Sequence, residues 1–261
     1  MHAQIILFDG FDPLDVIAPY EVLYAGGTAS GGAVSVELVS AEGPRDVVSG
    51  TGGLVLRATA ALDPARAGLI LVPGASGRVG APGETPDLDA ASGHAEGPGE
   101  TPGDDAASGH AEGPGEIPGH DARAGEGRRD ELIPVLLGRA LTTGLPALLK
   151  AAKDNPEVTL GAVCGGSLVL AMAGLLEGRY ATTHHLGLDM LDATGVHAVS
   201  ARVVDDGDLI TGAGVTSGLD LGLYLLEREV GPQVAHAVEE LFAHERRGTV
   251  WRPEGLVPAG L

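Results

Sequence analysis

The sequence is poor in cysteine, in aromatic residues and in long apolar runs. One of its 261 residues is a cysteine, Cys164, and 3% are aromatic. A single cysteine excludes an intramolecular disulfide and a zinc site built on several thiolates. Together with an N-terminal stretch that lacks a basic leader, it favours a cytoplasmic protein. No uninterrupted apolar stretch approaches the ~20 residues that a membrane-spanning helix needs, so we expect a soluble protein without a membrane partner.

Positive charge is also scarce. The chain has 16 Lys and Arg against 36 Asp and Glu, which gives a formal net charge of −20. A surface of this sign repels nucleic acid and anionic membranes. We therefore expect the partner to be a small-molecule substrate and not nucleic acid.

An acidic repeat interrupts the chain between 76 and 130. The motif Pro-Gly-Glu-(Thr/Ile)-Pro recurs every 16 residues, beginning at Pro82, Pro98 and Pro114. Almost no large apolar residue accompanies it, so burial cannot offset the entropy lost on ordering, and we predict a disordered surface insert and not a solenoid. Its histidines could bind a metal ion weakly, but a solvated linker is the simpler interpretation because nothing fixes their geometry. These histidines are His94, His110 and His120.

The flanking segments, 1–75 and 131–247, are predicted to form one α/β domain, with a C-terminal tail at 248–261. Apolar runs alternate there with segments of helical periodicity. Several runs lack polar alternation, which is typical of parallel strands buried on both faces of a sheet. The predicted strands are 5–8, 35–40, 54–58, 69–72, 158–163, 199–204 and 208–211. The predicted helices are 15–25, 131–142, 146–150, 167–176, 217–230 and 231–244.

Cys164 lies at the junction between the predicted strand 158–163 and the small residues Gly165, Gly166 and Ser167, which begin a predicted helix. Ligands of parallel sheets bind beyond the carboxyl ends of the strands. A sharp strand-to-helix turn, a nucleophile elbow, would expose the sulfur there, and the N–H groups of the helix start would favour its thiolate. The alternative is a buried cysteine that acts as a small apolar side chain. The two glycines favour the elbow because they let the backbone turn tightly.

Asp15 could manage the proton that a nucleophilic thiol must lose or regain. It follows the first predicted strand and so belongs to the same edge of the sheet as Cys164. The alternative is an N-cap, because Asp15 precedes an apolar helix. Gly74 and Ala75, after the strand at 69–72, would place backbone N–H groups near the sulfur, although a simple loop would also explain them.

Two adjacent histidines, His184 and His185, could take part in a Cys-His pair or a zinc site. In an extended segment neighbouring side chains point to opposite faces, so at most one of the two can face the sulfur. Packing or an interface is the simpler interpretation, and we predict no metal site. The Gly-Ala-Gly segment at 212–214 is not predicted to bind a nucleotide, because a third glycine and a following acidic strand end are missing.

Six segments form an ordered set that is more specific than any one of them. They are LDVIAPYEV at 14–22, VPGASG at 72–77, VCGGSLVL at 163–170, AGLLEGR at 173–179, ATTH at 181–184 and TGAGVTSGLD at 211–220. The set resembles the DJ-1/PfpI superfamily, which is class I glutamine amidotransferase-like, and within it the isonitrile hydratase branch. The resemblance covers nearly the whole chain except the repeat and the segment after Arg247.

The resemblance implies a flavodoxin-like three-layer α/β sandwich with a mostly parallel sheet, usually a homodimer, with Cys164 as the nucleophile. Asp15 falls where the hydratase branch carries an acidic partner for the thiol. One departure is Gly165, because the branch often has Thr there, and a hydroxyl that could order water is missing. The residues expected to bind the anion or substrate are Gly74, Ala75, Gly165 and His184.

The leading hypothesis is hydration of an isonitrile to an N-substituted formamide, a lyase reaction that needs no cofactor. The Cys164 thiolate attacks the terminal carbon while protonated Asp15 donates a proton to it, and water then replaces the sulfur. Two alternatives stay open. One is a DJ-1-like enzyme that acts on an α-oxoaldehyde or a biosynthetic intermediate. The other is a non-catalytic ligand-binding or redox-sensing module.

Overall fold

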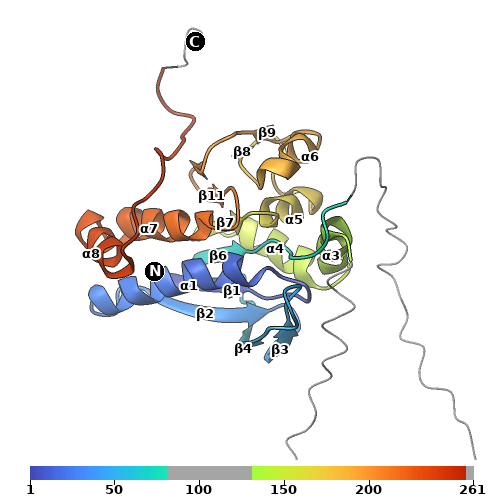
Figure 1. Cartoon of the computed structure of the whole chain (residues 1–261), viewed down its shortest axis with the longest axis horizontal. Helices are drawn as coiled ribbons and strands as arrows, with labels where there is room; N and C mark the ends of the chain where they lie inside the picture. The colour runs from blue at the N-terminus through green and yellow to red at the C-terminus, as the bar shows by residue number, and fades with distance from the viewer. Residues whose placement is uncertain (81–130, 257–261) are drawn as a thin grey trace, which may run out of the picture.

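The computed structural model describes residues 1–80 and 131–256 and shows an α/β sandwich of three layers (Figure 1). The repeats predicted within 82–118 and their histidines lie outside the described residues. A seven-stranded sheet forms the middle layer, in the order β10-β11-β7-β6-β1-β2-β5. Its neighbouring strands pair in parallel, except β10 and β11, which are antiparallel. The strands are β1 (His2–Ile6), β2 (Ser35–Ser40), β5 (Ala60–Ala61), β6 (Gly68–Val72), β7 (Val158–Val163), β10 (Val203–Asp205) and β11 (Leu209–Gly212).

The central strands are apolar along their length because both faces of the sheet are covered. Ile70 of β6 and Leu160 of β7 are register partners, and both are buried. Burial of one such side chain favours folding by about 1.5–3 kcal/mol. The parallel arrangement also brings the carboxyl ends of β1, β6 and β7 to one edge, where the loops that follow them meet.

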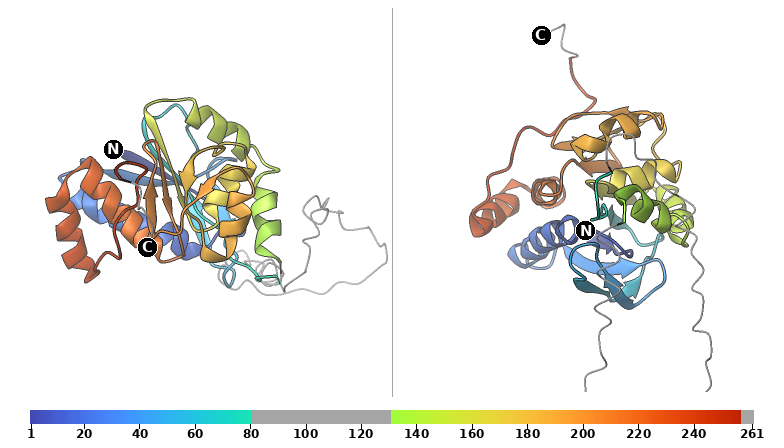
Figure 2. Two further views of the ribbon diagram at one scale, coloured as in Figure 1. Left: turned by 90° about the horizontal axis from the view of Figure 1, so that it is seen from above. Right: turned by 45° about the vertical axis from the view of Figure 1, so that its right-hand side comes forward.

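Helices cover both faces of the sheet. Figures 1 and 2 show α1, α7 and α8 on one face and α3, α4 and α5 on the other. A 3-10 turn, η2 (His185–Gly187), and the short helix α6 (Leu188–Asp192) follow α5. The larger helices are α1 (Pro13–Ala29), α3 (Ile133–Ala140), α4 (Leu145–Lys153), α5 (Gly166–Met172), α7 (Ser217–Glu229) and α8 (Pro232–Phe242).

Two glycines let α7 pack closely on α1. A Cβ atom at Gly218 would lie 2.8 Å from Cδ of Pro19, and one at Gly222 would lie 2.9 Å from Cγ1 of Val22. Larger residues would push the two helices apart. Because α1 is the next element after β1, this packing helps to hold α1 against the sheet.

The predicted fold class is confirmed, and the errors lie at the ends of elements and in short strands. The strands predicted at 35–40 and 158–163 have the same bounds as β2 and β7. The strand predicted at 199–204 is wrong in its first part, because β10 begins at Val203 and the chain before it pairs elsewhere. The strand predicted at 54–58 corresponds to β4 (Val55–Ala58), which pairs with β3 (Arg45–Val48), a strand that was not predicted. The small sheet of β8 (Tyr180–Ala181) and β9 (His197–Ala198) was not predicted either.

The C-terminal segment contacts the edge of the large sheet. Trp251 forms a parallel bridge with Val204: its N–H donates to Val203 O at 2.9 Å, and its carbonyl accepts from the Asp205 N–H at 2.9 Å. The indole lies 5.0 Å from the ring of Tyr180. The segment thus covers backbone groups that an edge strand would otherwise expose.

In the described ranges, no single helix has both the length and the apolar character needed to cross a membrane. The consecutive pair α3 and α4 reaches that length only when taken together, and the two helices are bent by 71°.

Candidate active site

Cys164 occupies the predicted nucleophile elbow between β7 and α5. Its φ of 55° lies in the left-handed region, which is uncommon for a residue with a side chain. Such strain persists where the surroundings fix the backbone. Here the Cys164 N–H donates to Gly212 O at 3.0 Å, and the hydroxyl of Thr183 donates to the Cys164 carbonyl at 2.7 Å. The elbow is therefore held by hydrogen bonds at both of its backbone polar groups.

Glycines let the loop after β6 approach this elbow. A Cβ atom at Gly166 would lie 2.0 Å from Val72 O, and one at Gly74 would lie 2.6 Å from the Gly165 nitrogen. A side chain at either position would force the two loops apart. Gly165 differs, because its nearest contacts for an added Cβ are Leu137 Cδ1 at 3.3 Å and the Gly74 Cα at 3.5 Å. A side chain at Gly165 would therefore meet less crowding than one at Gly74 or Gly166.

Asp15 lies in the first turn of α1 and is fully buried. Its interpretation as an N-cap is wrong: Asp12 takes that position, and its side chain accepts the Leu14 N–H at 2.9 Å. The Oδ2 atom of Asp15 accepts the Gly74 N–H at 2.9 Å, and its carboxyl interacts with the Cys164 thiol. Within the described part of the chain, Oδ1 has no hydrogen-bond partner.

Burial raises the pKa of Asp15 to about 8, and the negative charge of Asp12 adds to this effect. The hydrogen bond from Gly74 and the interaction with the Cys164 thiol act in the opposite direction. An ionised carboxyl with one poorly paired oxygen is costly in the interior, so the acid form persists. Asp15 is therefore mostly protonated at neutral pH and can donate a proton.

The pKa of the Cys164 thiol is raised as well. Burial is the largest cause, and the negative charge of Asp15 is the second. The Gly165 N–H lowers the pKa, as the position at a helix start predicts, but burial outweighs it. The expected resting thiolate is therefore wrong: the pair keeps its protons at neutral pH, and the sulfur loses its proton only during reaction.

A pocket of about 360 Å³ reaches Cys164, whose residue exposure is 8%. Its polar side chains are those of Asp12, Ser76, Cys164 and His184. Most of the other lining side chains are apolar, and they include Ile133, Leu137, Leu168, Met172, Met190 and Val215. Met172 and Met190 are half exposed, which places them toward solvent. The pocket thus suits an uncharged, largely apolar ligand.

His184 lines this pocket and His185 does not. The segment is not extended, because a 3-10 turn begins at His185, and the two imidazole rings lie 4.2 Å apart. The expectation that they point to opposite faces is therefore wrong. Burial and the neighbouring His185 lower the pKa of His184. A neutral His184 ring, whose Nδ1 accepts the Leu186 N–H at 3.3 Å, forms part of the wall.

The predicted backbone donors are arranged around the thiol. The Gly165 N–H interacts with the sulfur. Ala75 lines the pocket, and its N–H meets no acceptor within the described residues. The Gly74 N–H is occupied by Asp15. Gly74 thus helps to hold the acid and Gly165 faces the sulfur, while the Ala75 N–H remains available to a ligand.

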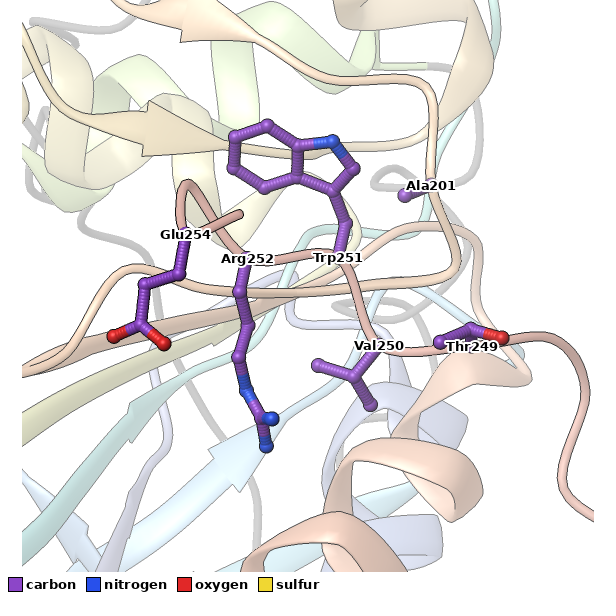
Figure 3. Close-up of a pocket in the computed structure, with 6 residues that line it drawn as sticks. All are labelled: Ala201, Thr249, Val250, Trp251, Arg252 and Glu254. Carbon is purple, nitrogen blue, oxygen red and sulfur yellow. The ribbon is translucent and has the colours of Figure 1, made fainter. Parts of the chain in front are cut away.

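A second hollow, of about 450 Å³, lies beside the C-terminal segment (Figure 3). It is lined by Ala201 and by residues of 249–254, and it shares no lining residue with the Cys164 pocket. Figure 3 shows the Trp251 and Arg252 side chains pointing to opposite sides of the chain. No cysteine lines this hollow. No group of three or more His, Cys, Asp or Glu side chains in 1–80 and 131–256 is arranged to hold a metal ion.

A family model and several curated proteins match parts of this chain. The family model described as DJ-1/PfpI family matches residues 140–228. An isonitrile hydratase of Pseudomonas putida is 49% identical over 77 residues, which are 30% of this chain and 34% of that protein. The HTH-type transcriptional regulator CdhR of Pseudomonas aeruginosa is 39% identical over 121 residues, which are 44% of this chain and 36% of the regulator. The chain thus spans about a third of the length of these curated relatives.

Solved structures share the fold over nearly the whole chain. A ThiJ/PfpI family protein from Pseudomonas syringae has a TM-score of 0.60 and 22% identity, and the match covers 95% of this chain and 76% of that one. Drosophila melanogaster DJ-1beta has a TM-score of 0.58 and 15% identity, and the match covers 94% of this chain and 98% of that one. These matches support the DJ-1/PfpI superfamily as the one that this chain resembles. The match to the family model includes Cys164 but begins well after Asp15.

Within this site, sequence reasoning missed Thr183 and Asp12 as supporting residues. Thr183 stands beside His184, which drew attention by its chemistry, whereas a threonine hydroxyl in an apolar context carries no such signal. Asp12 lies between the first predicted strand and the predicted helix at 15–25. Its position before Pro13 was an available signal, because proline is common at the first position of a helix and Asp is common at the N-cap.

Proposed function

We propose that this protein hydrates an isonitrile to an N-substituted formamide, with Cys164 as nucleophile and Asp15 as proton donor. The observation that carries the proposal is a buried thiol in contact with a carboxyl group whose pKa is raised to about 8. An isonitrile is neutral, and its terminal carbon accepts both a proton and a nucleophile. The apolar pocket suits its substituent. The partial identity with isonitrile hydratase supports the same reaction.

The first step forms a carbon–sulfur bond. Asp15 gives its proton to the terminal carbon as the Cys164 sulfur bonds to that carbon, and the thiol proton passes to the Asp15 carboxylate. The product is a thioimidate, R–N=CH–S–Cys. Because the thiol loses its proton only as the bond forms, the step does not require a resting thiolate.

The second step adds water. Water attacks the thioimidate carbon, the nitrogen takes a proton from Asp15, and a proton of the water replaces it. The carbon–sulfur bond then breaks, the hydroxyl proton is lost and the sulfur is protonated, which releases R–NH–CHO and restores both side chains. Since Gly165 lacks a hydroxyl, His184 and Ser76 are the candidates on the pocket wall for ordering this water.

Turnover of cyclohexyl isocyanide, followed by formamide formation, tests the proposal. Cys164→Ala and Asp15→Asn are each expected to lose turnover by at least about 100-fold, because each removes a group that exchanges a proton or a bond with the substrate. A parallel assay of methylglyoxal loss distinguishes an α-oxoaldehyde enzyme. Consumption of methylglyoxal without hydration of the isonitrile would overturn the proposal.

The domain limits, 1–75 with 131–247, and the homodimer and cytoplasmic location remain proposals beside it. Light scattering of the purified full chain tests the dimer. The charge-based expectation of no nucleic-acid partner is tested by titrating duplex DNA, which matters because a regulator is among the relatives.

A further inference from the structure

We propose that Thr183 is a positioning residue for the nucleophile. Its hydroxyl holds the peptide group that follows Cys164 and thereby directs the Gly165 N–H toward the sulfur. This inference rests on the proposed role of Cys164 as nucleophile, but it concerns a residue that neither touches the substrate nor follows from the reaction.

The contact is direct and buried. Thr183 is 1% exposed, and its Oγ1 donates to the Cys164 carbonyl at 2.7 Å. Within the described residues, Thr183 is absent from the lining of the Cys164 pocket. Any effect of its hydroxyl on the thiol must therefore pass through the backbone.

Peptide geometry provides the route. The Cys164 carbonyl and the Gly165 N–H belong to one planar trans peptide group, so they point in opposite directions. A hydrogen bond that fixes the carbonyl on one side also fixes the N–H on the other. That N–H interacts with the Cys164 sulfur and favours its anion. Because Cys164 holds a left-handed φ of 55°, which an unrestrained cysteine avoids, the peptide would tend to rotate if its anchor were lost.

The neighbouring residue offers a matched control. Thr182 is equally buried, at 1% exposed. Its Oγ1 reaches only the Thr183 carbonyl, at 3.5 Å, while its own N–H and carbonyl bond to Thr211 Oγ1 and Ser167 Oγ. Loss of the Thr182 hydroxyl therefore perturbs the same segment without releasing the elbow.

The test compares Thr183→Ala with Thr183→Ser, since both lack the methyl group and they differ only in the hydroxyl. The readout is the rate constant for alkylation of Cys164 by iodoacetamide between pH 7 and 9, with Thr182→Ala as control. We expect Thr183→Ala to be alkylated about threefold to tenfold more slowly than Thr183→Ser, as loss of one hydrogen bond to the developing anion predicts. Thr182→Ala should match the wild type.

Turnover separates this inference from the proposed function. If the wild type hydrates an isonitrile, Thr183→Ala should lower kcat with KM nearly unchanged, because the pocket is intact. If the wild type does not, the proposed function fails while the alkylation series still decides the role of Thr183. Equal alkylation of the Ala and Ser variants, with both folded by near-UV circular dichroism, overturns the inference. The inference is also overturned if Thr182→Ala slows alkylation of Cys164 as much as Thr183→Ala does.

Discussion

The Asp15 carboxyl lies against the Cys164 thiol, and each shifts the proton affinity of the other. The interaction with the thiol lowers the pKa of Asp15 slightly against a large rise caused by burial, and the charge of Asp15 raises the pKa of the thiol. The two groups therefore form a coupled pair that holds its protons at neutral pH. This pair gives the site an acid and a nucleophile in direct contact.

The first prediction concerns stability. In the folded state the pKa of Asp15 is raised from 3.8 to about 8. Between these values the native chain binds one proton more than the unfolded chain, so stability falls as pH rises and is fully present below about pH 4. Asp15→Asn lacks this dependence. The free energy of unfolding of the Asn variant minus that of the wild type should therefore increase by about 1.4 kcal/mol per pH unit between about pH 4 and 8. Urea unfolding of both proteins across this range measures the difference.

A constant difference between the two proteins over this pH range would contradict the raised pKa of Asp15. The Asn variant is a fair comparison because its side-chain oxygen can still accept the Gly74 N–H. Asp189→Asn, an exposed site on α6, serves as the control for a carboxyl without such a partner.

The second prediction concerns Asp12. Its negative charge raises the pKa of both Asp15 and Cys164. Asp12→Asn keeps a residue suited to the N-cap of α1 and removes the charge. The pKa of Asp15 should fall, so the decline of turnover that accompanies loss of the Asp15 proton should shift to lower pH. A pH–rate profile of kcat checks this, and an unshifted decline would show that Asp12 does not tune the pair.

The third prediction uses the glycines of the elbow. Gly74→Ala places a Cβ 2.6 Å from the Gly165 nitrogen and 2.8 Å from Asp15 Oδ2, so it should cost about 1–3 kcal/mol in stability and most of the activity. Gly165→Ala meets nothing closer than 3.3 Å and should fold with a smaller loss. Gly144→Ala, with no atom within 4 Å, is the control. Thermal unfolding ranks the three, and the reverse order for Gly74 and Gly165 would contradict the packing.

The fourth prediction concerns the C-terminal segment. Trp251 covers β10 and packs its indole near Tyr180. Trp251→Ala should lower the free energy of unfolding by about 1–3 kcal/mol, because apolar contact and edge pairing are both weakened. Glu254→Ala, at an exposed position of the same segment (Figure 3), should change little. Equal midpoints for the two variants in thermal unfolding would show that the segment does not stabilise the sheet.

Much of the fold could be predicted because its central strands are rich in apolar residues. The runs that became β2 and β7 have no competing periodicity, so their bounds follow from the sequence. The pairing of β4 with β3 could not be found in this way, since Arg45 and Asp46 make β3 look like a polar loop. Its pairing is stabilised in part by an ion pair between Arg57 and Asp46 at 2.7 Å, which only the folded chain brings together.

The ends of the predicted strands indicated where the site lies, but the sequence did not indicate the protonation states of its residues. Cys164 and Asp15 follow strands of one parallel sheet, so their common edge could be expected. The charge state of the thiol was predicted wrongly, because the helix start is visible in the sequence while the depth of burial is not. The support from Thr183 depends on the path of the chain after α5, which brings a residue 19 positions away to the elbow.

The most direct test of the account is isonitrile hydration by the wild type measured across pH 6 to 10, beside Cys164→Ser and Asp15→Asn. We predict formamide formation that declines as pH rises through about 8, the pKa of Asp15, and no turnover above background in either variant. Undiminished hydration by the Asp15→Asn protein, or a wild-type rate that rises through the same pH range, would contradict the assignment of Asp15 as the proton donor to a carbon attacked by Cys164.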